Sequence, residues 1–234
     1  MENALQFIRE VQPDILLLQE VFWQEGAEPQ HLDLLAEAMA VPHTAYAPTS
    51  GHHDAPGYHK HGNAVLSRWP ITQEESRFYD VPYNDDYRET ADWTFAPRNL
   101  QNLRVATPGG ELQVLNTHGI WGYDGRDNER RLAMAEVISG EIAGNGIPTI
   151  LAGDFNTDPD TETVGIIERK LTNIYKGKIS STFNMLHKTK PIFAQLTVDM
   201  MFASPSLRVI GAECPEVNVS DHRPLVTRFA WPTK

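Results

Sequence analysis

The sequence has a single cysteine in its 234 residues, Cys214. One thiol excludes an intramolecular disulfide and a zinc cluster built from several thiolates, and it is typical of proteins from a reducing compartment. No apolar run approaches the ~20 residues that a membrane-spanning helix needs. The first residues show no basic segment followed by an apolar one, which is the pattern of a secretory signal. We therefore expect a cytoplasmic protein without a membrane span.

Basic residues are also scarce. The chain has 20 Lys and Arg against 31 Asp and Glu, which gives a formal net charge of −11. This balance disfavours general nucleic-acid binding, which needs cations to replace the counterions of the phosphates. It is compatible with a site that collects divalent cations. The hydrophobic fraction of 41% is that of a globular protein, and the length predicts one domain over residues 1–234.

The hydrophobic pattern alternates between helical and strand spacing along the whole chain. Helical spacing predicts four helices, over residues 3–11, 32–39, 129–142 and 162–169. Short apolar runs predict strands over residues 15–20, 46–47, 62–67, 100–106, 112–117, 148–151, 195–202, 208–210 and 224–229. Strands followed by helices, and then hairpin-like strand pairs, predict an α/β fold of mixed sheets covered by helices.

The strand predicted at 148–151 runs into Gly153-Asp154-Phe155-Asn156. If the strand continues, its alternation points Asp154 and Asn156 to the same face, about 7 Å apart. A carboxylate that orients a water beside an amide that donates to an oxyanion would suit hydrolysis. The alternative is a polar strand end that only caps the next turn.

Other predicted strands also end in polar residues capable of chemistry. These residues are Glu20, His118, Asp199 and the pair Asp221-His222. Burying so many such groups without partners would be costly. Since ligands in open sheets bind at strand ends, a shared site explains them together.

Six of these segments occur in an order that resembles the endonuclease/exonuclease/phosphatase superfamily, which includes DNase I-like nucleases. The segments are Leu17–Glu20, Gly62–Ile71, Asn116–His118, Gly153–Asn156, Val198–Phe202 and Ser220–Leu225. The resemblance spans residues 3–229. It implies a four-layer α/β sandwich, with two mixed sheets face to face and helices outside. It also implies Mg²⁺- or Mn²⁺-dependent hydrolysis of a phosphoester.

The resemblance also implies a role for each matching residue. Glu20 corresponds to the metal-binding carboxylate, a hard oxygen ligand that suits Mg²⁺ or Mn²⁺. Asp154 corresponds to the residue that positions or deprotonates the attacking water, and Asn156 to its oxyanion-stabilising neighbour. His222 corresponds to the histidine that contacts the scissile phosphate, oriented by Asp199 through a carboxylate–imidazole hydrogen bond.

Two further site residues follow from the same resemblance. Asp221 is expected near the metal, and His118 is a candidate for protonating the leaving oxygen. Each assignment has a structural alternative. Glu20 would be a surface carboxylate, Asp199 a turn cap, His118 a core or loop histidine, and Asp221-His222 a hydrogen-bonded pair without catalytic function.

The N-terminus departs from the family pattern. Family members begin with a strand that carries a metal-binding Asn before the first helix, whereas here only 19 residues precede Glu20 and a helix occupies them. Asn3 is expected to be the N-cap of that helix rather than a ligand. We therefore expect the first strand of the family pattern to be absent from this sequence. Its absence would expose backbone groups and apolar surface, and weaker metal binding, lower stability or dimerisation across the gap are expected.

Several segments are candidates for substrate selection. Residues 52–61 hold four histidines in what reads as a loop between strands, where a second metal site competes with a solvated, flexible loop. The aromatic and acidic segment 78–95 is either a lid that contacts substrate or satellite packing. Arg98 and Asn99 are expected near phosphate, and Trp121 at the rim of the site.

These observations predict a Mg²⁺-dependent phosphoesterase, with a phosphodiesterase as the first choice. The phosphoester substrate would be a nucleic acid, a lipid head group or a sugar phosphate. A phosphomonoesterase of a sugar or inositol phosphate is the enzymatic alternative. A non-catalytic binding module is the other alternative, and the missing strand favours it.

Overall fold

The computed structural model describes residues 1–54, 57–87, 93–144 and 146–231. Its α-helices are α1 (Glu2–Val11), α2 (His31–Met39), α3 (Glu129–Glu141) and α4 (Glu162–Glu168). Its strands are β1 (Ile15–Gln24), β2 (His43–Asp54), β3 (Gly57–Ser67), β4 (Ile71–Phe78), β5 (Asn99–Thr107), β6 (Gly110–His118), β7 (Thr149–Asp154), β8 (Thr172–Asn173), β9 (Asp199–Ala203), β10 (Arg208–Glu213) and β11 (Val226–Ala230). Two 3₁₀ turns complete the described elements, η1 (Trp93–Phe95) and η2 (Pro191–Gln195). No described helix is long and apolar enough to span a bilayer.

The strands form a six-stranded sheet, a three-stranded sheet and a two-stranded sheet. The six-stranded sheet has the order β4-β5-β6-β7-β9-β8, and its neighbours are antiparallel except for β6 and β7. This parallel pair is joined by a crossover that contains α3, as a parallel connection requires. The three-stranded sheet has the order β1-β3-β2, and β10 pairs with β11.

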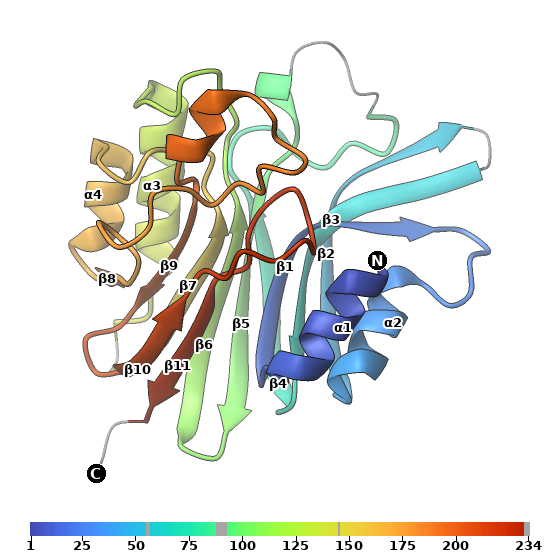
Figure 1. Ribbon diagram of the computed structural model, residues 1–234, viewed down its shortest axis with the longest axis horizontal. Helices are drawn as coiled ribbons and strands as arrows, with labels where there is room; N and C mark the ends of the chain where they lie inside the picture. Colours follow the sequence, from blue (N-terminus) through green and yellow to red (C-terminus); the bar gives the residue numbers. More distant parts are fainter. Residues whose placement is uncertain (55–56, 88–92, 145, 232–234) are drawn as a thin grey trace.

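Three hydrophobic clusters stack these elements into the expected four layers (Figure 1). In β1, Leu17 points into the cluster between the sheets, whereas Leu16 and Leu18 point outward against α1 and α2. In β6, Val114 lies in the inner cluster, and Leu115 lies in the cluster under α3 and α4. Strand alternation thus gives the six-stranded and the three-stranded sheet two apolar faces each, one for the other sheet and one for its helices. The predicted α/β sandwich is confirmed.

Three local expectations were wrong. The histidine-rich segment 52–61 is not a loop, because its described residues belong to the long β2–β3 hairpin. Asn3 is not an N-cap, because α1 begins one residue earlier, and its side chain donates to the carbonyl oxygen of Asn218. The strand predicted over 195–202 begins only at Asp199, after the 3₁₀ turn η2.

Two strands of the smaller sheets have one unpaired edge each within the described residues. Within the described residues, β1 pairs only with β3, and β11 pairs only with β10. Apolar residues of both strands, Leu17 and Phe229 among them, pack on the same inner cluster. The three-stranded and two-stranded sheets therefore cover one face of the six-stranded sheet without forming a continuous ladder.

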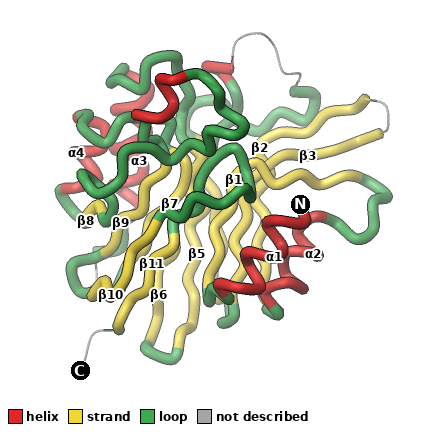
Figure 2. Tube along the Cα trace, in the orientation of Figure 1, coloured by secondary structure: helices red, strands yellow, loops and turns green. Residues whose placement is uncertain are grey.

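A bulge interrupts β1 within the strand, at Glu20. The pairing of β1 with β3 shifts register between Leu18 and Val21, and Glu20 has a φ of 56°. Such a left-handed conformation is uncommon for a residue other than glycine. Figure 2 shows that long loops gather at the upper end of the sheets. The irregularity thus takes Glu20 out of the ladder, which resumes at Val21, and brings its carboxylate near the ends of β6 and β7.

Asn116 joins the two sheets beside this bulge. Its fully buried side-chain amide donates to the carbonyl oxygens of Leu18 and Ala64, over 3.0 and 3.1 Å. Its oxygen accepts a 2.7 Å hydrogen bond from Nε2 of Gln19. One amide on β6 therefore satisfies backbone groups of β1 and β3 across the interior of the sandwich, and it fixes the position of the residue before Glu20.

We expect Asn116→Ala to lower the free energy of unfolding by about 2–4 kcal/mol, because it leaves buried carbonyls of two strands unpaired. Urea unfolding at constant m-value measures this loss. Asn102→Ala is the matched control. The half-buried Asn102 amide hydrogen-bonds to side chains of α3 and β6 and does not connect the two sheets. A loss below about 1 kcal/mol for Asn116→Ala would show that the tie across the sheets is unimportant.

Candidate active site

Backbone geometry explains the glycine of the Gly-Asp-Phe-Asn motif. Gly153 has a φ of 147°, and a Cβ there would lie 1.9 Å from the carbonyl oxygen of Thr117. Only glycine therefore allows β7 to approach β6 at this point. The close approach places Asp154 directly opposite His118 in the parallel pairing.

Asp154 and Asn156 do not share a strand face, contrary to the expectation from alternation. β7 ends at Asp154, and Asn156 has a left-handed φ of 52°. The Asn156 backbone N–H donates to Oδ1 of Asp154 over 2.7 Å, and its side-chain Nδ2 donates to the Gly119 carbonyl oxygen over 3.2 Å. A turn, rather than a continued strand, thus brings the amide next to the carboxylate.

Arg131 holds this turn, and sequence reasoning missed it. The side chain is fully buried in α3, and its guanidinium donates to the carbonyl oxygens of Asn156, Ile120 and Arg126. These acceptors belong to the loops that follow β6 and β7. The only sequence signal was a charged residue on the apolar side of a helix, which has no distinctive spacing.

Asp199 and His222 form a close pair on the other side of Asp154. Asp199 begins β9 and is the direct antiparallel partner of Asp154. Its Oδ2 lies 2.8 Å from Nδ1 of His222. The ring of Phe183 packs against the His222 imidazole, with their centroids 4.5 Å apart. The carboxylate and the aromatic contact together fix the orientation of the imidazole.

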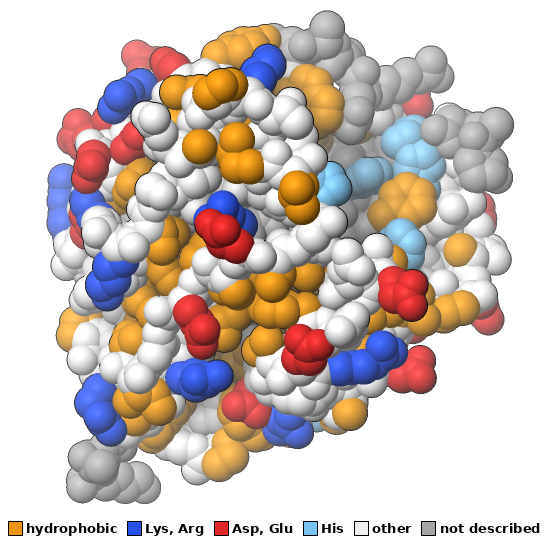
Figure 3. Space-filling model, viewed as in Figure 1, with side chains coloured by type: hydrophobic (Ala, Val, Ile, Leu, Met, Phe, Trp, Pro, Cys, Tyr) orange, Lys and Arg blue, Asp and Glu red, His pale blue; other side chains and the backbone are white. Residues whose placement is uncertain are grey.

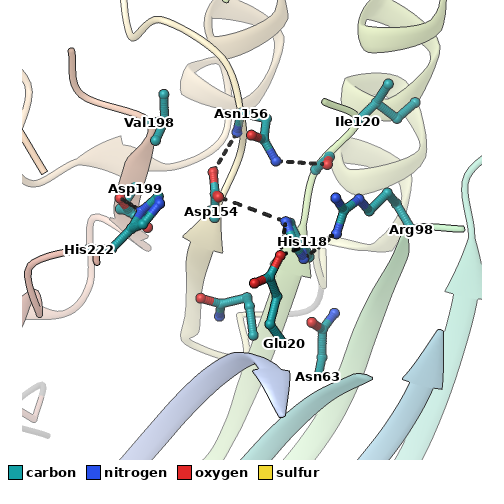
Figure 4. A network of polar contacts seen from close by, with 12 residues as sticks. Glu20, Asn63, Arg98, His118, Ile120, Asp154, Asn156, Val198, Asp199 and His222 are labelled. Atoms are coloured by element: carbon teal, nitrogen blue, oxygen red, sulfur yellow. Dashed lines mark hydrogen bonds and ion pairs between the residues drawn. The ribbon is translucent and has the colours of Figure 1, made fainter. Parts of the chain in front are cut away.

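Glu20 reaches the same centre from the three-stranded sheet (Figure 4). Nε2 of His118 lies 3.8 Å from Oε1 of Glu20 and also 3.8 Å from Oδ2 of Asp154. Arg98 lies behind His118, with Nη1 at 2.5 Å from Nδ1. Because a guanidinium only donates, Nδ1 accepts this hydrogen bond, and the ring hydrogen lies on Nε2.

The side chains of this centre have strongly altered acidities. Burial and the Asp199 carboxylate raise the pKa of Asp154. Burial alone would lower the pKa of His222, but Asp199 and the other nearby carboxylates raise it to about 9. Burial and the positive charges of Arg98 and His222 hold the pKa of His118 well below its usual range. At neutral pH, His222 is therefore an imidazolium and His118 a neutral imidazole.

The donor set fits a divalent cation. Asp154 and Asp199 each offer a carboxylate oxygen and His222 a ring nitrogen, and these atoms lie within 4.8 Å of one another. Because both ring nitrogens of an imidazolium carry hydrogen, the carboxylates rather than His222 would hold a cation. In the part of the chain that the structure describes, no other three His, Cys, Asp or Glu residues meet this condition. Glu20 adds a carboxylate whose side chain is 63% exposed. Carboxylate oxygens are the ligands that Mg²⁺ and Mn²⁺ prefer, and a cation would relieve the repulsion between neighbouring carboxylates.

The remaining predicted residues are not part of this group. Asp221 precedes His222 in the chain, and its carboxylate pairs with Lys188 at 2.8 Å. Asn99 is fully buried and accepts a 2.8 Å hydrogen bond from Asn63, so it lies behind the surface rather than on it. Trp121 is half-buried and packs against Tyr123, with ring centroids 4.7 Å apart.

The sequence is similar to known proteins along most of its length. The model of the Endonuclease/Exonuclease/phosphatase family matches residues 1–222. Uncharacterized protein YbhP of Escherichia coli strain K12 is 31% identical over 164 residues, which are 64% of this chain and 56% of YbhP. UPF0294 protein VV1_1880 of Vibrio vulnificus is 31% identical over 151 residues, 63% of this chain and 50% of that protein. The chain thus spans about half the length of these relatives.

A solved structure shows the same fold. The endonuclease/exonuclease/phosphatase from Bacteroides vulgatus aligns with a TM-score of 0.73 at 18% identity, over 98% of this chain and 89% of that one. Because this identity is low, the likeness establishes the architecture only. The match of the family model to nearly the whole sequence, together with this architecture, shows that the chain belongs to the endonuclease/exonuclease/phosphatase family.

Proposed function

We propose that this protein is a phosphodiesterase that uses Mg²⁺ or Mn²⁺. The family acts on phosphoesters and generally uses divalent metals. One observation carries the proposal. The carboxylates of Glu20 and Asp154 both lie 3.8 Å from Nε2 of His118, and the Asp199–His222 pair lies beside them. Carboxylates for a cation and an imidazolium for a phosphate are thus present in one place.

Hydrolysis needs a water that attacks phosphorus and loses a proton. Asp154 is suited to accept this proton, because its raised pKa brings its basicity closer to that required at neutral pH. The imidazolium of His222 is suited to donate a hydrogen bond to a phosphate oxygen. As the new P–O bond forms, the bond to the alcohol breaks, and the departing oxygen takes a proton from solvent.

The other side chains stabilise charge on the phosphate. Asn156 has a second side-chain N–H besides the one that bonds Gly119, and it would donate to the developing oxyanion. His118 is better suited to donate a hydrogen bond from Nε2 than to protonate the leaving oxygen, because its low pKa keeps the ring neutral. Glu20, with Asp154, would hold the cation, which would neutralise negative charge on the phosphate in the transition state.

The charge of the site favours a diester over a monoester. By formal charge, the three carboxylates of Glu20, Asp154 and Asp199 face two cations, Arg98 and the His222 imidazolium. With one bound divalent metal ion, these groups together would carry a formal charge of +1. This charge balances the single negative charge of a phosphodiester better than the two charges of a monoester.

We expect kcat/KM for bis-p-nitrophenyl phosphate to exceed that for p-nitrophenyl phosphate by about tenfold or more with Mg²⁺ or Mn²⁺, for this electrostatic reason. Release of p-nitrophenol measures both reactions. Faster hydrolysis of the monoester would instead indicate a phosphomonoesterase of a sugar or inositol phosphate. Hydrolysis of neither compound would contradict both enzymes and favour a binding module.

Asp154→Asn should lower kcat at least about 100-fold, because the variant loses the group that accepts the proton. Steady-state kinetics with the better nitrophenyl ester tests this, and a melting curve confirms that the variant is folded. Asp160→Asn is the matched control, since its exposed carboxylate lies on the loop that follows the same strand. Equal turnover by Asp154→Asn and wild type would remove the basis of the catalytic proposal.

Glu20→Gln should weaken Mn²⁺ binding at least about tenfold, because an amide replaces a charged ligand. Isothermal titration calorimetry without substrate measures this directly and does not depend on activity. Glu25→Gln, an exposed residue just beyond β1, is the control. Unchanged Mn²⁺ affinity in Glu20→Gln would assign the cation to other residues.

A further inference from the structure

A pocket extends away from the catalytic centre toward the β2–β3 hairpin. Its inner end is formed by Glu20, Arg98 and His118, which belong to the centre itself. The rest of its lining, which we call the outer pocket, consists of Thr49, Ser50, His52, His61, Gly62, Asn63, Tyr87, Trp93, Ala96 and Pro97. A substrate whose phosphate lies at Glu20 would therefore extend one of its substituents between these side chains.

The hairpin forms one wall of the outer pocket. His52 and His59 are direct cross-strand partners, with ring centroids 3.5 Å apart, and His61 follows on the same face of β3. The rings of His59 and His61 pack on Phe22 of β1, at 5.1 and 5.3 Å. Figure 3 shows histidine side chains gathered on this side of the molecule. The contacts with Phe22 and between the rings hold the imidazoles in place beside the pocket.

The second wall is a neighbouring segment that is hydrogen-bonded to the hairpin. Gly51 N–H donates to the Asn84 carbonyl oxygen, and Tyr87 N–H donates to the Gly51 carbonyl oxygen. A Cβ on Gly51 would lie 2.7 Å from the hydroxyl of Tyr58 and 3.0 Å from that of Tyr83. The absence of a side chain at Gly51 therefore allows the two walls to approach each other, and Tyr87 is positioned opposite the histidines.

The chemistry of the outer pocket favours an uncharged polar ring. None of its ten lining residues is Lys, Arg, Asp or Glu, and only Ala96 and Pro97 are small apolar residues. A second phosphate or a nucleic-acid strand would need cations there, and a long acyl chain would need an apolar lining. The hydroxyl groups and imidazoles can donate and accept hydrogen bonds, and Tyr87 and Trp93 offer aromatic surface. A sugar ring matches both features, because its hydroxyl groups bond to polar side chains while its C–H face packs on an aromatic ring.

We infer that the outer pocket binds a monosaccharide-like alcohol that is esterified to the scissile phosphate. This inference rests on the proposed function, since the phosphate must lie at the catalytic centre. In this arrangement Trp93 packs on the ring, and His52 and His61 bond to its hydroxyl groups. Substrate selection thus depends on the hairpin and on the segment attached to it.

The test compares matched esters with and without a sugar ring. We would measure kcat/KM for methyl hexose-6-yl phosphate and methyl butyl phosphate, and for the monoesters hexose 6-phosphate and butyl phosphate. Wild type should prefer the hexose ester by about tenfold or more. Trp93→Ala and His52→Ala should each reduce the hexose-to-butyl ratio about tenfold. Phe95→Ala should keep the ratio, since this exposed aromatic residue lies in the same 3₁₀ turn but does not line the pocket.

The outcomes separate this inference from the proposed function. If all esters are hydrolysed without a preference for the hexose, or if Trp93→Ala lowers both rates equally, the sugar pocket is wrong and the hydrolase stands. A preference for a nucleoside ester over the hexose ester would also overturn it. If no ester is hydrolysed, isothermal titration calorimetry measures the binding of hexose 6-phosphate to wild type and to Trp93→Ala. Binding that is weaker in the variant supports the sugar pocket. No binding to wild type overturns it.

Discussion

The side-chain amide of Asn116 is the contact on which the geometry of the site depends. It crosses the interior of the sandwich and bonds to the backbone of β1 and β3 from β6. The catalytic centre draws Glu20 from the three-stranded sheet and His118 and Asp154 from the six-stranded sheet. Apolar packing between the sheets is not directional. The hydrogen bonds of Asn116 are directional, and they therefore set the distance between Glu20 on one sheet and His118 and Asp154 on the other.

Pairing between opposite charges explains why ionised side chains are tolerated at this largely buried site. Asp199 pairs with His222, and Arg98 donates to His118, so burial of the cations and anions is partly compensated within the protein. The raised pKa of Asp154 shows that the compensation is incomplete. A carboxylate whose ionised form is destabilised by burial is stabilised by a nearby cation or by accepting a proton. Both effects fit hydrolysis of a phosphoester.

Sequence reasoning was most successful where local pattern decides the structure. The helix predicted over 129–142 was confirmed within one residue, because its apolar spacing and the N-cap at Asn128 are local signals. It failed for β4, whose residues 71–78 are mostly polar and exposed at a sheet edge. It identified Asp154 and Asn156 but gave the wrong backbone between them, since a left-handed residue is fixed by surrounding contacts. The functions of Asn116 and Arg131 depend on distant carbonyl oxygens, which no spacing reveals.

The architecture assigns reaction and selection to different elements. The groups proposed for proton transfer and for contact with the phosphate lie on β6, β7, β9 and the segment before β11, where ladder hydrogen bonds and Arg131 restrict movement. The outer pocket is instead built from the hairpin and the segment tied to it at Gly51. These two regions meet at Glu20, which stands on the β1 bulge beside both of them. Because the hairpin belongs to a different sheet from Asp154 and Asp199, we expect substitutions in the outer pocket to change which alcohol is bound without displacing these two carboxylates.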